Sequence, residues 1–180
     1  LVIAESALER VPEPIYGHPS VVKQARKLGK KTSQLLLDRT YHHAAMIKLR
    51  GAERRGRPDI IHLSLLAALG TPLNKEGLLR VFVHTLENKV ISVNPETRLP
   101  RNYDRFVGLI EQLYDDGKVP KNGPILLSLE SKDLRGIMRE LGSPYIVALS
   151  KSGKPAALSE VAESLTKHMD PTIIVGGFPR

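Results

Sequence analysis

Short apolar runs bounded by glycine, proline or polar residues recur along the chain, and in its last third they alternate with amphipathic stretches. This pattern predicts strands over 125–129, 145–149 and 172–175, with helices over 132–141 and 159–168 between them. Strands that alternate with helices of roughly ten residues are typical of parallel β-α-β units. The pattern therefore predicts an α/β fold whose mostly parallel sheet is flanked by helices.

The first two thirds of the chain are less regular, and their elements are predicted one by one. Strands are expected over 1–4, 35–38, 79–85 and 90–93, the last two joined by a turn. Helices are expected over 20–28 and 41–49, and a longer one between the N-cap Asn102 and the C-terminal glycine Gly117. The segment 60–69 is almost wholly apolar, so its periodicity leaves open a buried strand that runs into a helix.

The chain is basic, because 27 Lys and Arg residues outnumber 19 Asp and Glu residues and give a net charge of +8. Such a balance favours an anionic partner, either nucleic acid or an anionic membrane. Aromatic residues make up only 4% of the chain and Trp is absent, so a surface of stacking platforms for bases is not expected. We expect contacts from guanidinium groups to phosphates instead.

The length of the chain and its lack of cysteine limit the classes of protein to which it can belong. A chain of 180 residues is long enough for one sizeable domain with its own core. The absence of cysteine rules out disulfides and thiolate metal sites and fits a reducing cytoplasm. The histidines lack metal-ligand spacing, no apolar run reaches the length of a membrane span, and neither a Walker nor a G-x-S-x-G motif occurs.

Arg57 and Asp59 lie two residues apart, with Pro58 between them, where the chain turns apolar. If this tract is extended, both side chains project from one face and can form an ion pair. A guanidinium held by a carboxylate is suited to recognising a planar or anionic group. An ordinary surface ion pair beside Arg54 and Arg55 explains the same spacing, but the fixed backbone of proline favours a preorganised site.

Three further arginines, Arg98, Arg101 and Arg105, mark the point where a proline-bounded loop runs into the helix after Asn102. Positive charge at a helix N-terminus is unfavourable, because the helix dipole is already positive there. We therefore expect this arginine ladder to bind phosphate groups, with a solvated helix end as the alternative. If the turn is helical, Arg101 and Arg105 lie close together.

Two of the predicted strands end in small or polar residues, at 150–153 and at Gly176-Gly177. Ligands of open parallel sheets bind beyond the carboxyl ends of the strands, and glycine there allows a ligand to approach or simply forms a tight turn. Because no G-x-G-x-x-G motif is present, this is not a dinucleotide fingerprint. Two such turns on neighbouring strands would nevertheless form a backbone-lined slot for an adenine edge.

Four tracts carry a resemblance to a known family: Y-H-H-A-A-M from residue 41, R-G-R-P-D-I-I-H from residue 55, T-R-L-P-R-N-Y-D-R-F from residue 97 and V-G-G-F-P from residue 175. They resemble the ribosome-biogenesis methyltransferases that act on N1 of a pseudouridine in small-subunit rRNA. That family belongs to the SPOUT, or α/β-knot, class. The resemblance implies such a fold in a single domain over residues 1–180, with an RNA-binding extension within about 39–105.

The resemblance also implies partners and site residues. The partners are S-adenosylmethionine as cofactor, small-subunit rRNA that already contains the pseudouridine, and a second copy of the chain in a homodimer; no metal or membrane is implied. RNA contacts fall on Arg57, steadied by Asp59, and on Arg98, Arg101 and Arg105. Cofactor contacts fall on Leu149, Ser150, Gly176 and Gly177. Since family members continue past the V-G-G-F-P turn with a loop and a final helix that complete the knot, we expect the sequence to be a portion of a longer protein.

The chemistry implied is the transfer of a methyl group from a sulfonium to a ring nitrogen, for which the protein has chiefly to orient donor and acceptor. A guanidinium near the base can stabilise charge that develops on the ring carbonyls as the N1 proton leaves. We assign this catalytic role to Arg57 with Asp59 as its orienter, and Asp59 as the base is the second assignment. The alternative functions are a non-catalytic RNA-binding assembly factor with a vestigial cofactor slot, and a methyltransferase for another RNA or base.

Overall fold

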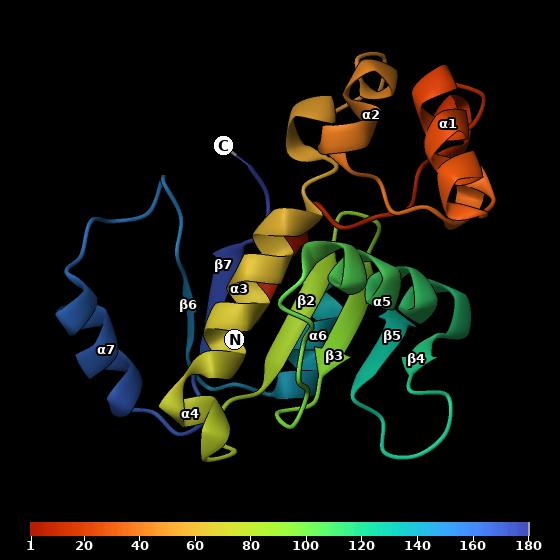
Figure 1. Ribbon diagram of the computed structural model, residues 1–180. Helices are drawn as coiled ribbons and strands as arrows, with labels where there is room; N and C mark the ends of the chain where they lie inside the picture. The colour runs from red at the N-terminus through yellow and green to blue at the C-terminus, as the bar shows by residue number, and fades with distance from the viewer. Residues whose placement is uncertain (180) are drawn as a thin grey trace.

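The computed structural model describes residues 1–179 and contains a seven-stranded sheet with helices on both faces (Figure 1). The strands are β1 (Val2–Ser6), β2 (Val81–Thr85), β3 (Lys89–Val93), β4 (Lys118–Val119), β5 (Leu127–Ser131), β6 (Ile146–Ala148) and β7 (Thr172–Gly176). The α-helices are α1 (Pro19–Leu28), α2 (Arg39–Met46), α3 (Pro58–Gly70), α4 (Pro72–Lys75), α5 (Tyr103–Asp116), α6 (Leu134–Leu141) and α7 (Leu158–Thr166). None of the helices in this part of the chain is long and apolar enough to cross a membrane.

The strand order is β4-β5-β3-β2-β1-β7-β6. The neighbours β2, β1, β7 and β6 are parallel, whereas β3 is antiparallel to β2 and β5, and β4 is antiparallel to β5. Strands β5, β2, β1, β7 and β6 therefore point one way and only β3 and β4 point the other way, which confirms the predicted mostly parallel α/β sheet. The predicted β-α-β unit is present as β6-α7-β7, while α6 leads from β5 behind the sheet to its far edge (Figure 1).

Helices α3 and α5 cover the front face of the sheet as drawn in Figure 1, and α6 covers the back. Ile61 and Leu65 of α3 and Phe106 and Ile110 of α5 are fully buried in the main core against β1, β2 and β3. On the back, Ile137 of α6 packs in a smaller core with residues of β1 and β3. Asn102 caps α5 and Gly117 ends it in a left-handed conformation, as predicted.

Helices α1 and α2 form a separate layer above the carboxyl ends of the parallel strands (Figure 1). This layer has its own small core, in which Val21 and Ala25 of α1 pack with Ala45 and Met46 of α2. The carboxylate of Glu111 on α5, only 4% exposed, ties it to the sheet layer. It accepts a hydrogen bond from the Leu36 backbone N–H at 2.9 Å and pairs with Lys30 at 2.5 Å.

Two predictions of local structure are wrong. Residues 35–38 form no strand; only Leu36 makes an isolated bridge, to Arg10, because the buried leucines of this segment pack under α1 and α2 and against the main core. The tract after Arg57 is helical instead of extended, because Pro58 opens α3 at the first helical position, which suits its fixed φ. The whole of 60–69 lies in that helix.

Candidate active site

Arg57 and Asp59 form the predicted ion pair at the N-terminal end of α3. Arg57 is the N-cap residue and Asp59 lies in the first turn, so the start of the helix, and not an extended strand, brings their side chains to one side. Arg57 Nε donates to Asp59 Oδ1 at 2.8 Å, and Arg57 Nη2 donates to Asp59 Oδ2 at 2.7 Å. This two-point contact fixes the plane of the guanidinium.

The pair is charged at neutral pH and still accessible. The hydrogen bond from Arg57 lowers the pKa of Asp59 below its usual value, and the hydrogen bond to Asp59 raises the pKa of Arg57. The Arg57 side chain is 36% exposed and that of Asp59 is 43% exposed. Within residues 1–179, Nη1 of Arg57 makes no hydrogen bond, so its donors remain for a ligand.

The backbone of Ala7, just after β1, joins the end of β7 to the start of α3. The Arg57 backbone N–H donates to the Ala7 carbonyl at 3.1 Å, and the Ala7 N–H donates to the Gly177 carbonyl at 2.9 Å. The Gly177 N–H in turn donates to the carbonyl of Ala4 in β1 at 2.7 Å. The arginine predicted to contact RNA and a glycine predicted to contact the cofactor are therefore bonded to the same residue.

The two glycines that end β7 differ in their surroundings. A Cβ atom on Gly177 would lie 2.3 Å from Ser6 Oγ and 2.8 Å from Ile61 Cδ1, so only glycine fits between β1 and α3. Gly176 is exposed, and the three atoms nearest to a Cβ there all belong to the Phe178 side chain, the closest at 2.9 Å. Close packing within the protein accounts for the second glycine, and the first is the one open to a ligand.

The end of β6 lies beside these glycines, because β6 and β7 are parallel neighbours with Ala148 opposite Ile174. Leu149 continues the pairing by donating its backbone N–H to the Ile174 carbonyl at 2.9 Å, and its apolar side chain is 45% exposed. At Ser150 the chain turns, and the Gly153 N–H donates to the Ser150 carbonyl at 3.1 Å. The four predicted cofactor residues thus occupy two adjoining strand ends.

The arginine ladder spans an anchored loop and the first turn of α5. Thr97 Oγ1 donates to the Leu126 carbonyl at 2.9 Å, and the His62 ring of α3 lies 2.7 Å from the Pro100 carbonyl. Arg98 and Arg101 lie on this loop, Arg105 lies in the first turn of α5, and all three are exposed. In the described part of the chain none of them has a carboxylate within 4.0 Å.

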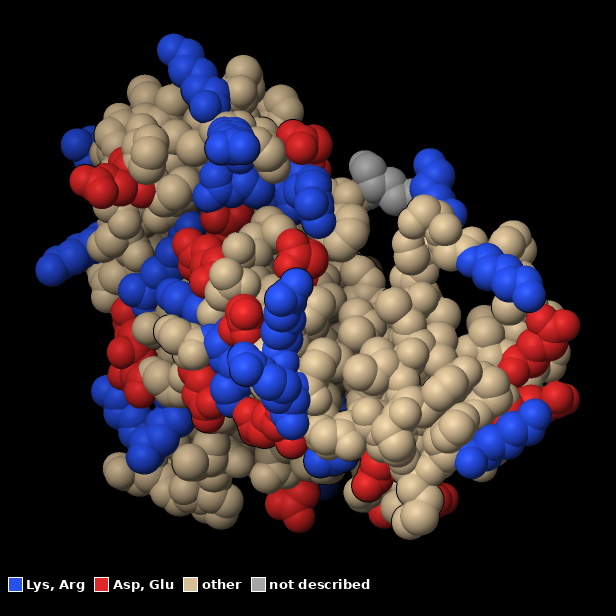
Figure 2. Space-filling model, turned by 180° about the vertical axis from the view of Figure 1, so that it is seen from behind, with Lys and Arg blue, Asp and Glu red and all other residues tan. Residues whose placement is uncertain are grey.

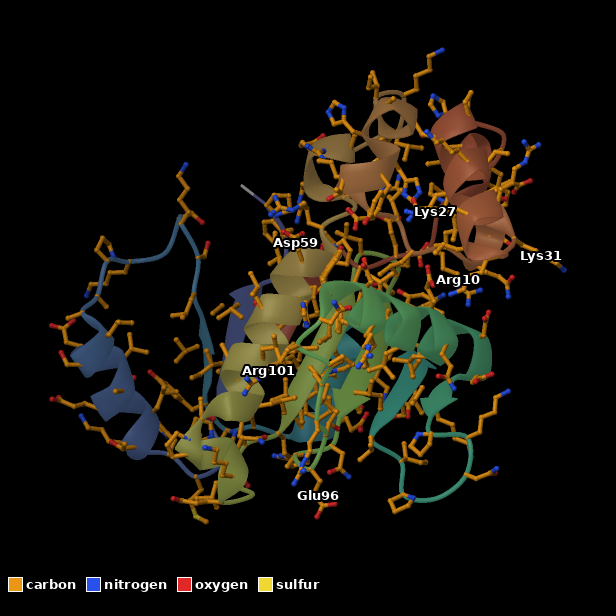
Figure 3. The ribbon with its side chains drawn as sticks, viewed as in Figure 1. Arg10, Lys27, Lys31, Asp59, Glu96 and Arg101 are labelled. Atoms are coloured by element: carbon orange, nitrogen blue, oxygen red, sulfur yellow. The ribbon has the colours of Figure 1, made fainter. Side chains whose placement is uncertain are left out.

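Figure 3 labels Asp59 at the top of α3 and, lower in the same view, Arg101, which follows the Pro100 carbonyl that His62 of α3 contacts. Arg101 precedes the N-cap Asn102, so it lies outside α5 and is not the helical neighbour of Arg105.

A contact that the sequence analysis did not identify links the start of α5, next to the ladder, to the start of α2. Tyr103, the first residue of α5, donates its hydroxyl to Asp38 Oδ2 at 2.5 Å, and Asp38 Oδ1 caps α2 by accepting from the Thr40 N–H at 2.8 Å. Burial, and then the bond to Asp38, raise the pKa of Tyr103 far above its usual value, so the hydroxyl keeps its proton. Sequence spacing carries no signal for this contact, because its partners are 65 residues apart.

Across residues 1–179, no group of three or more His, Asp or Glu side chains gathers as metal ligands would.

Comparison with known proteins gives a consistent result. The sequence model of the family described as EMG1/NEP1 methyltransferase matches residues 1–180. "Ribosomal RNA small subunit methyltransferase Nep1" of Thermococcus kodakarensis is 48% identical over 99% of this chain and 81% of its own length, and the protein of the same name from Thermococcus sibiricus is 47% identical with the same coverage. The crystal structure of Archaeoglobus fulgidus Nep1 bound to S-adenosylhomocysteine superposes with a TM-score of 0.86 at 38% identity, over 99% of this chain and 78% of that one.

The packing at Gly177 leads to a stability prediction. Gly177→Ala is expected to lower the free energy of unfolding by about 1–3 kcal/mol, because the added methyl group is forced against β1 and α3. Gly176→Ala, one residue earlier, is expected to change it by about 0.5 kcal/mol or less. Urea unfolding followed by circular dichroism measures both, and equal stability of the two variants would contradict the packing role of Gly177.

Proposed function

Because the chain belongs to the EMG1/NEP1 methyltransferase family, we propose that it methylates small-subunit ribosomal RNA with S-adenosylmethionine during ribosome biogenesis. The observation that carries this proposal is the junction at Ala7, which fastens the Arg57–Asp59 pair to the glycine turn that follows β7. An RNA-recognition group and a cofactor turn at one edge of the sheet are what a methyl transfer to RNA requires. We place this activity in the cytoplasm, which the absence of cysteine supports.

The acceptor we propose is N1 of a pseudouridine, as the family motifs suggest. Arg57 keeps donors free for the ring carbonyl of such a base, where negative charge develops as the N1 proton leaves. Both oxygens of Asp59 are engaged by Arg57, and the lowered pKa of Asp59 makes it a weak proton acceptor. These observations favour Asp59 as the residue that orients Arg57, and not as the base.

We assign the cofactor to the adjoining ends of β6 and β7. The exposed apolar side chain of Leu149 and the exposed backbone of Gly176 suit an adenosine moiety, and the turn at Ser150 closes one side. When bound, S-adenosylmethionine supplies the activated methyl group. Gly177 contributes by letting α3 and its arginine approach this edge closely.

The ladder binds RNA phosphates in this proposal. Its three arginines have no acidic partner in the described chain; burial of Thr97 and Leu99 fixes the loop with Arg98 and Arg101, and α5 carries Arg105. Cations held in place without a counter-charge are suited to a phosphate backbone. Together with Arg57 they form the RNA-binding side of a single domain, within the predicted 39–105 extension.

We propose that the protein works as a homodimer. On the back of the molecule, the surface over β7 and β6 carries few charged side chains (Figure 2). Nearby apolar side chains are exposed, including Ile146 of β6 at 45% and Leu158 of α7 at 82%. A largely uncharged surface beside an edge strand is suited to contact with a second copy.

Binding of S-adenosylhomocysteine, measured by calorimetry, tests the proposed function. The wild-type protein is expected to bind it, and Gly176→Val is expected to abolish binding, because the branched side chain is forced against the Phe178 ring and covers the exposed backbone where we place the cofactor. Gly17→Val serves as the control, since a Cβ atom at Gly17 meets nothing within 4 Å. A wild-type protein that binds RNA but no S-adenosylhomocysteine would support the non-catalytic assembly factor, and full binding by Gly176→Val would contradict the site.

The ladder predicts a specific salt dependence of RNA binding. Replacing any one of Arg98, Arg101 or Arg105 by Ala is expected to reduce the slope of log affinity against log salt by about 0.7–0.9, because one phosphate contact is lost. Arg139→Ala on α6 changes the net charge equally at an exposed position behind the sheet, and its slope should match that of the wild type. Unaltered slopes in all three ladder variants would show that the arginines only form a solvated helix end and bind no phosphate.

A double-mutant cycle tests whether Arg57 and Asp59 act as one unit. Arg57→Gln is expected to reduce methyl transfer to an oligonucleotide with one pseudouridine by roughly 10²–10³-fold, through loss of charge stabilisation. Asp59→Asn should reduce both RNA affinity and transfer, and the double variant should be little worse than either single one. Glu130→Gln, in the exposed pair with Lys132, is the control. Additive losses would show that Arg57 and Asp59 act separately. A lower transfer rate with intact RNA binding in Asp59→Asn alone would identify Asp59 as the base.

A further inference from the structure

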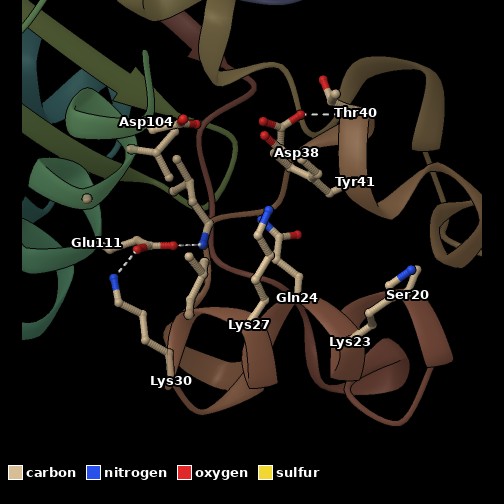
Figure 4. Close-up of a pocket in the computed structure, with 14 residues that line it drawn as sticks. Ser20, Lys23, Gln24, Lys27, Lys30, Asp38, Thr40, Tyr41, Asp104 and Glu111 are labelled. Atoms are coloured by element: carbon tan, nitrogen blue, oxygen red, sulfur yellow. Dashed lines mark hydrogen bonds and ion pairs between the residues drawn. The ribbon is translucent and has the colours of Figure 1, made fainter. Parts of the chain in front are cut away.

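A groove of about 620 Å³ lies between α1 and α5 and has not been assigned a role above (Figure 4). One wall is the face of α1 that carries Lys23 and Lys27, and the other is the face of α5 that carries Asp104 and Glu111. Its end beside α2 is formed by Asp38, Thr40 and Tyr41. This groove is outside the predicted 39–105 extension on its α1 side.

The α1 wall carries an excess of positive charge, because its own segment of the chain contains no acidic residue. No acidic residue occurs between Glu13 and Asp38, whereas α1 and the turn after it contain Lys23, Arg26, Lys27, Lys30 and Lys31. Lys23 and Lys27 are one helical turn apart, so both side chains reach the groove. Both are exposed, and within residues 1–179 neither has a carboxylate within 4.0 Å.

Most acidic side chains of the groove already form ion pairs or hydrogen bonds within the protein. Glu111 is held by Lys30 and by the Leu36 backbone N–H, so its charge is already neutralised (Figure 4). Asp38 is buried and accepts from Tyr103 and from the Thr40 N–H. Only Asp104 remains as an exposed acid on the rim, and Arg105 follows it directly. An anion in the groove would therefore meet mainly the two lysines.

An exposed aromatic ring lies at the α2 end of the groove. Tyr41 is 46% exposed, although only five tyrosines and three phenylalanines occur in the chain. Its ring is inclined at 63° to that of His42, with 6.5 Å between centroids, so the two rings are not stacked face to face. Cations beside an exposed aromatic ring are the usual arrangement for binding single-stranded RNA, in which phosphates pair with the cations and an unpaired base stacks on the ring.

The groove continues from the candidate active site. Asp38 lines its α2 end and bonds to Tyr103, the first residue of α5, which follows the loop with the arginine ladder. Asp38 and Tyr103 are also close enough to Arg57 to raise its pKa. A strand that leaves the Arg57–Asp59 pair therefore reaches Tyr41 first and the lysines of α1 next.

We infer that the groove between α1 and α5 binds the RNA strand that flanks the target nucleotide, with a base stacked on Tyr41 and phosphates on Lys23 and Lys27. This inference rests on the proposed function and adds a second contact region beyond the ladder. It assigns to α1 the task of binding RNA outside the modified nucleotide. Methyl transfer at saturating RNA does not depend on it.

The test compares two RNAs, a short oligonucleotide with a central pseudouridine and one with single-stranded extensions on both sides. Wild-type protein should bind the long RNA more tightly. Lys23→Gln with Lys27→Gln should remove this advantage and reduce the salt slope for the long RNA by about 1.4, from about 0.7 for each single-strand phosphate. Affinity for the short RNA, binding of S-adenosylhomocysteine and the transfer rate at saturating RNA should be unchanged.

Two controls separate the groove from general charge and from folding. Lys75→Gln with Lys167→Gln removes the same charge at the opposite end of the molecule, at the end of α4 and just after α7, and should leave the slope as in the wild type (Figure 1). Tyr41→Ala should weaken binding of the long RNA roughly 5- to 150-fold, whereas Tyr41→Phe, which keeps the ring, should bind normally.

Three outcomes overturn the inference. Equal effects of the two lysine pairs show that only net charge matters, and equal wild-type affinity for the two RNAs shows that no flanking strand is bound. In both cases methyl transfer by the wild type leaves the proposed function intact. Failure of the wild type to bind or methylate either RNA overturns the proposed function together with the inference.

Discussion

The short backbone contacts around Ala7 are the constraint on which the rest of the site depends. Ala7 accepts from Arg57 and donates to Gly177, so segments from the start, the first third and the end of the chain meet at one residue. The contact is possible because Gly177 has no side chain, which allows Ile61 of α3 to approach the end of β1. Any displacement of this turn therefore moves the guanidinium of Arg57 relative to the strand ends where we place the cofactor.

The distribution of charge on the surface depends on which acidic side chains are paired inside the protein. Glu9 is 1% exposed and is paired with Arg55, Glu111 is paired with Lys30, and Asp38 is bonded to Tyr103. These carboxylates join α1, α2 and α5 to the sheet layer, where each satisfies buried polar groups. The three arginines of the ladder, Lys23 and Lys27 have no carboxylate within 4.0 Å in the described chain, whereas other surface cations form ion pairs. Part of the net charge of +8 is therefore accessible, at some cost in self-repulsion, and under the proposed function it serves RNA binding.

Periodicity and turn chemistry predicted most of the fold, because they act over a few residues. The strands of the last third, the cap at Asn102 and the stop at Gly117 depend only on local sequence. The segment 35–38 was wrongly predicted as a strand, because an apolar run does not reveal whether it pairs with a sheet or fills a core under helices. The Arg57–Asp59 pair was predicted correctly from the wrong geometry, since two residues across a proline can also be brought together by the first turn of a helix.

The parts of the site that the sequence could not reveal are contacts between distant segments. Residue types identify Tyr103 and Asp38 only as an aromatic residue and an acid, and their bond requires the fold that places α5 beside α2. The same holds for the two glycines after β7: the motif predicts a turn, but only the packing distinguishes the glycine that α3 needs from the exposed one.

The paired state of Arg57 determines how the site responds to pH. Because the pKa of Asp59 is lowered in the folded protein, the pair stabilises the fold above the ordinary carboxylate range, and this contribution is lost only as pH falls through the lowered value. Arg57, whose pKa is raised, stays charged throughout. Under the proposed function, Arg57 is a fixed positive charge beside the acceptor base, since it neither titrates nor leaves Asp59 near neutral pH. In that role it stabilises negative charge on the base without reorganisation at the moment of reaction. In the same proposal, proton removal from the base falls to solvent or to another group, because both oxygens of Asp59 are already bound to Arg57.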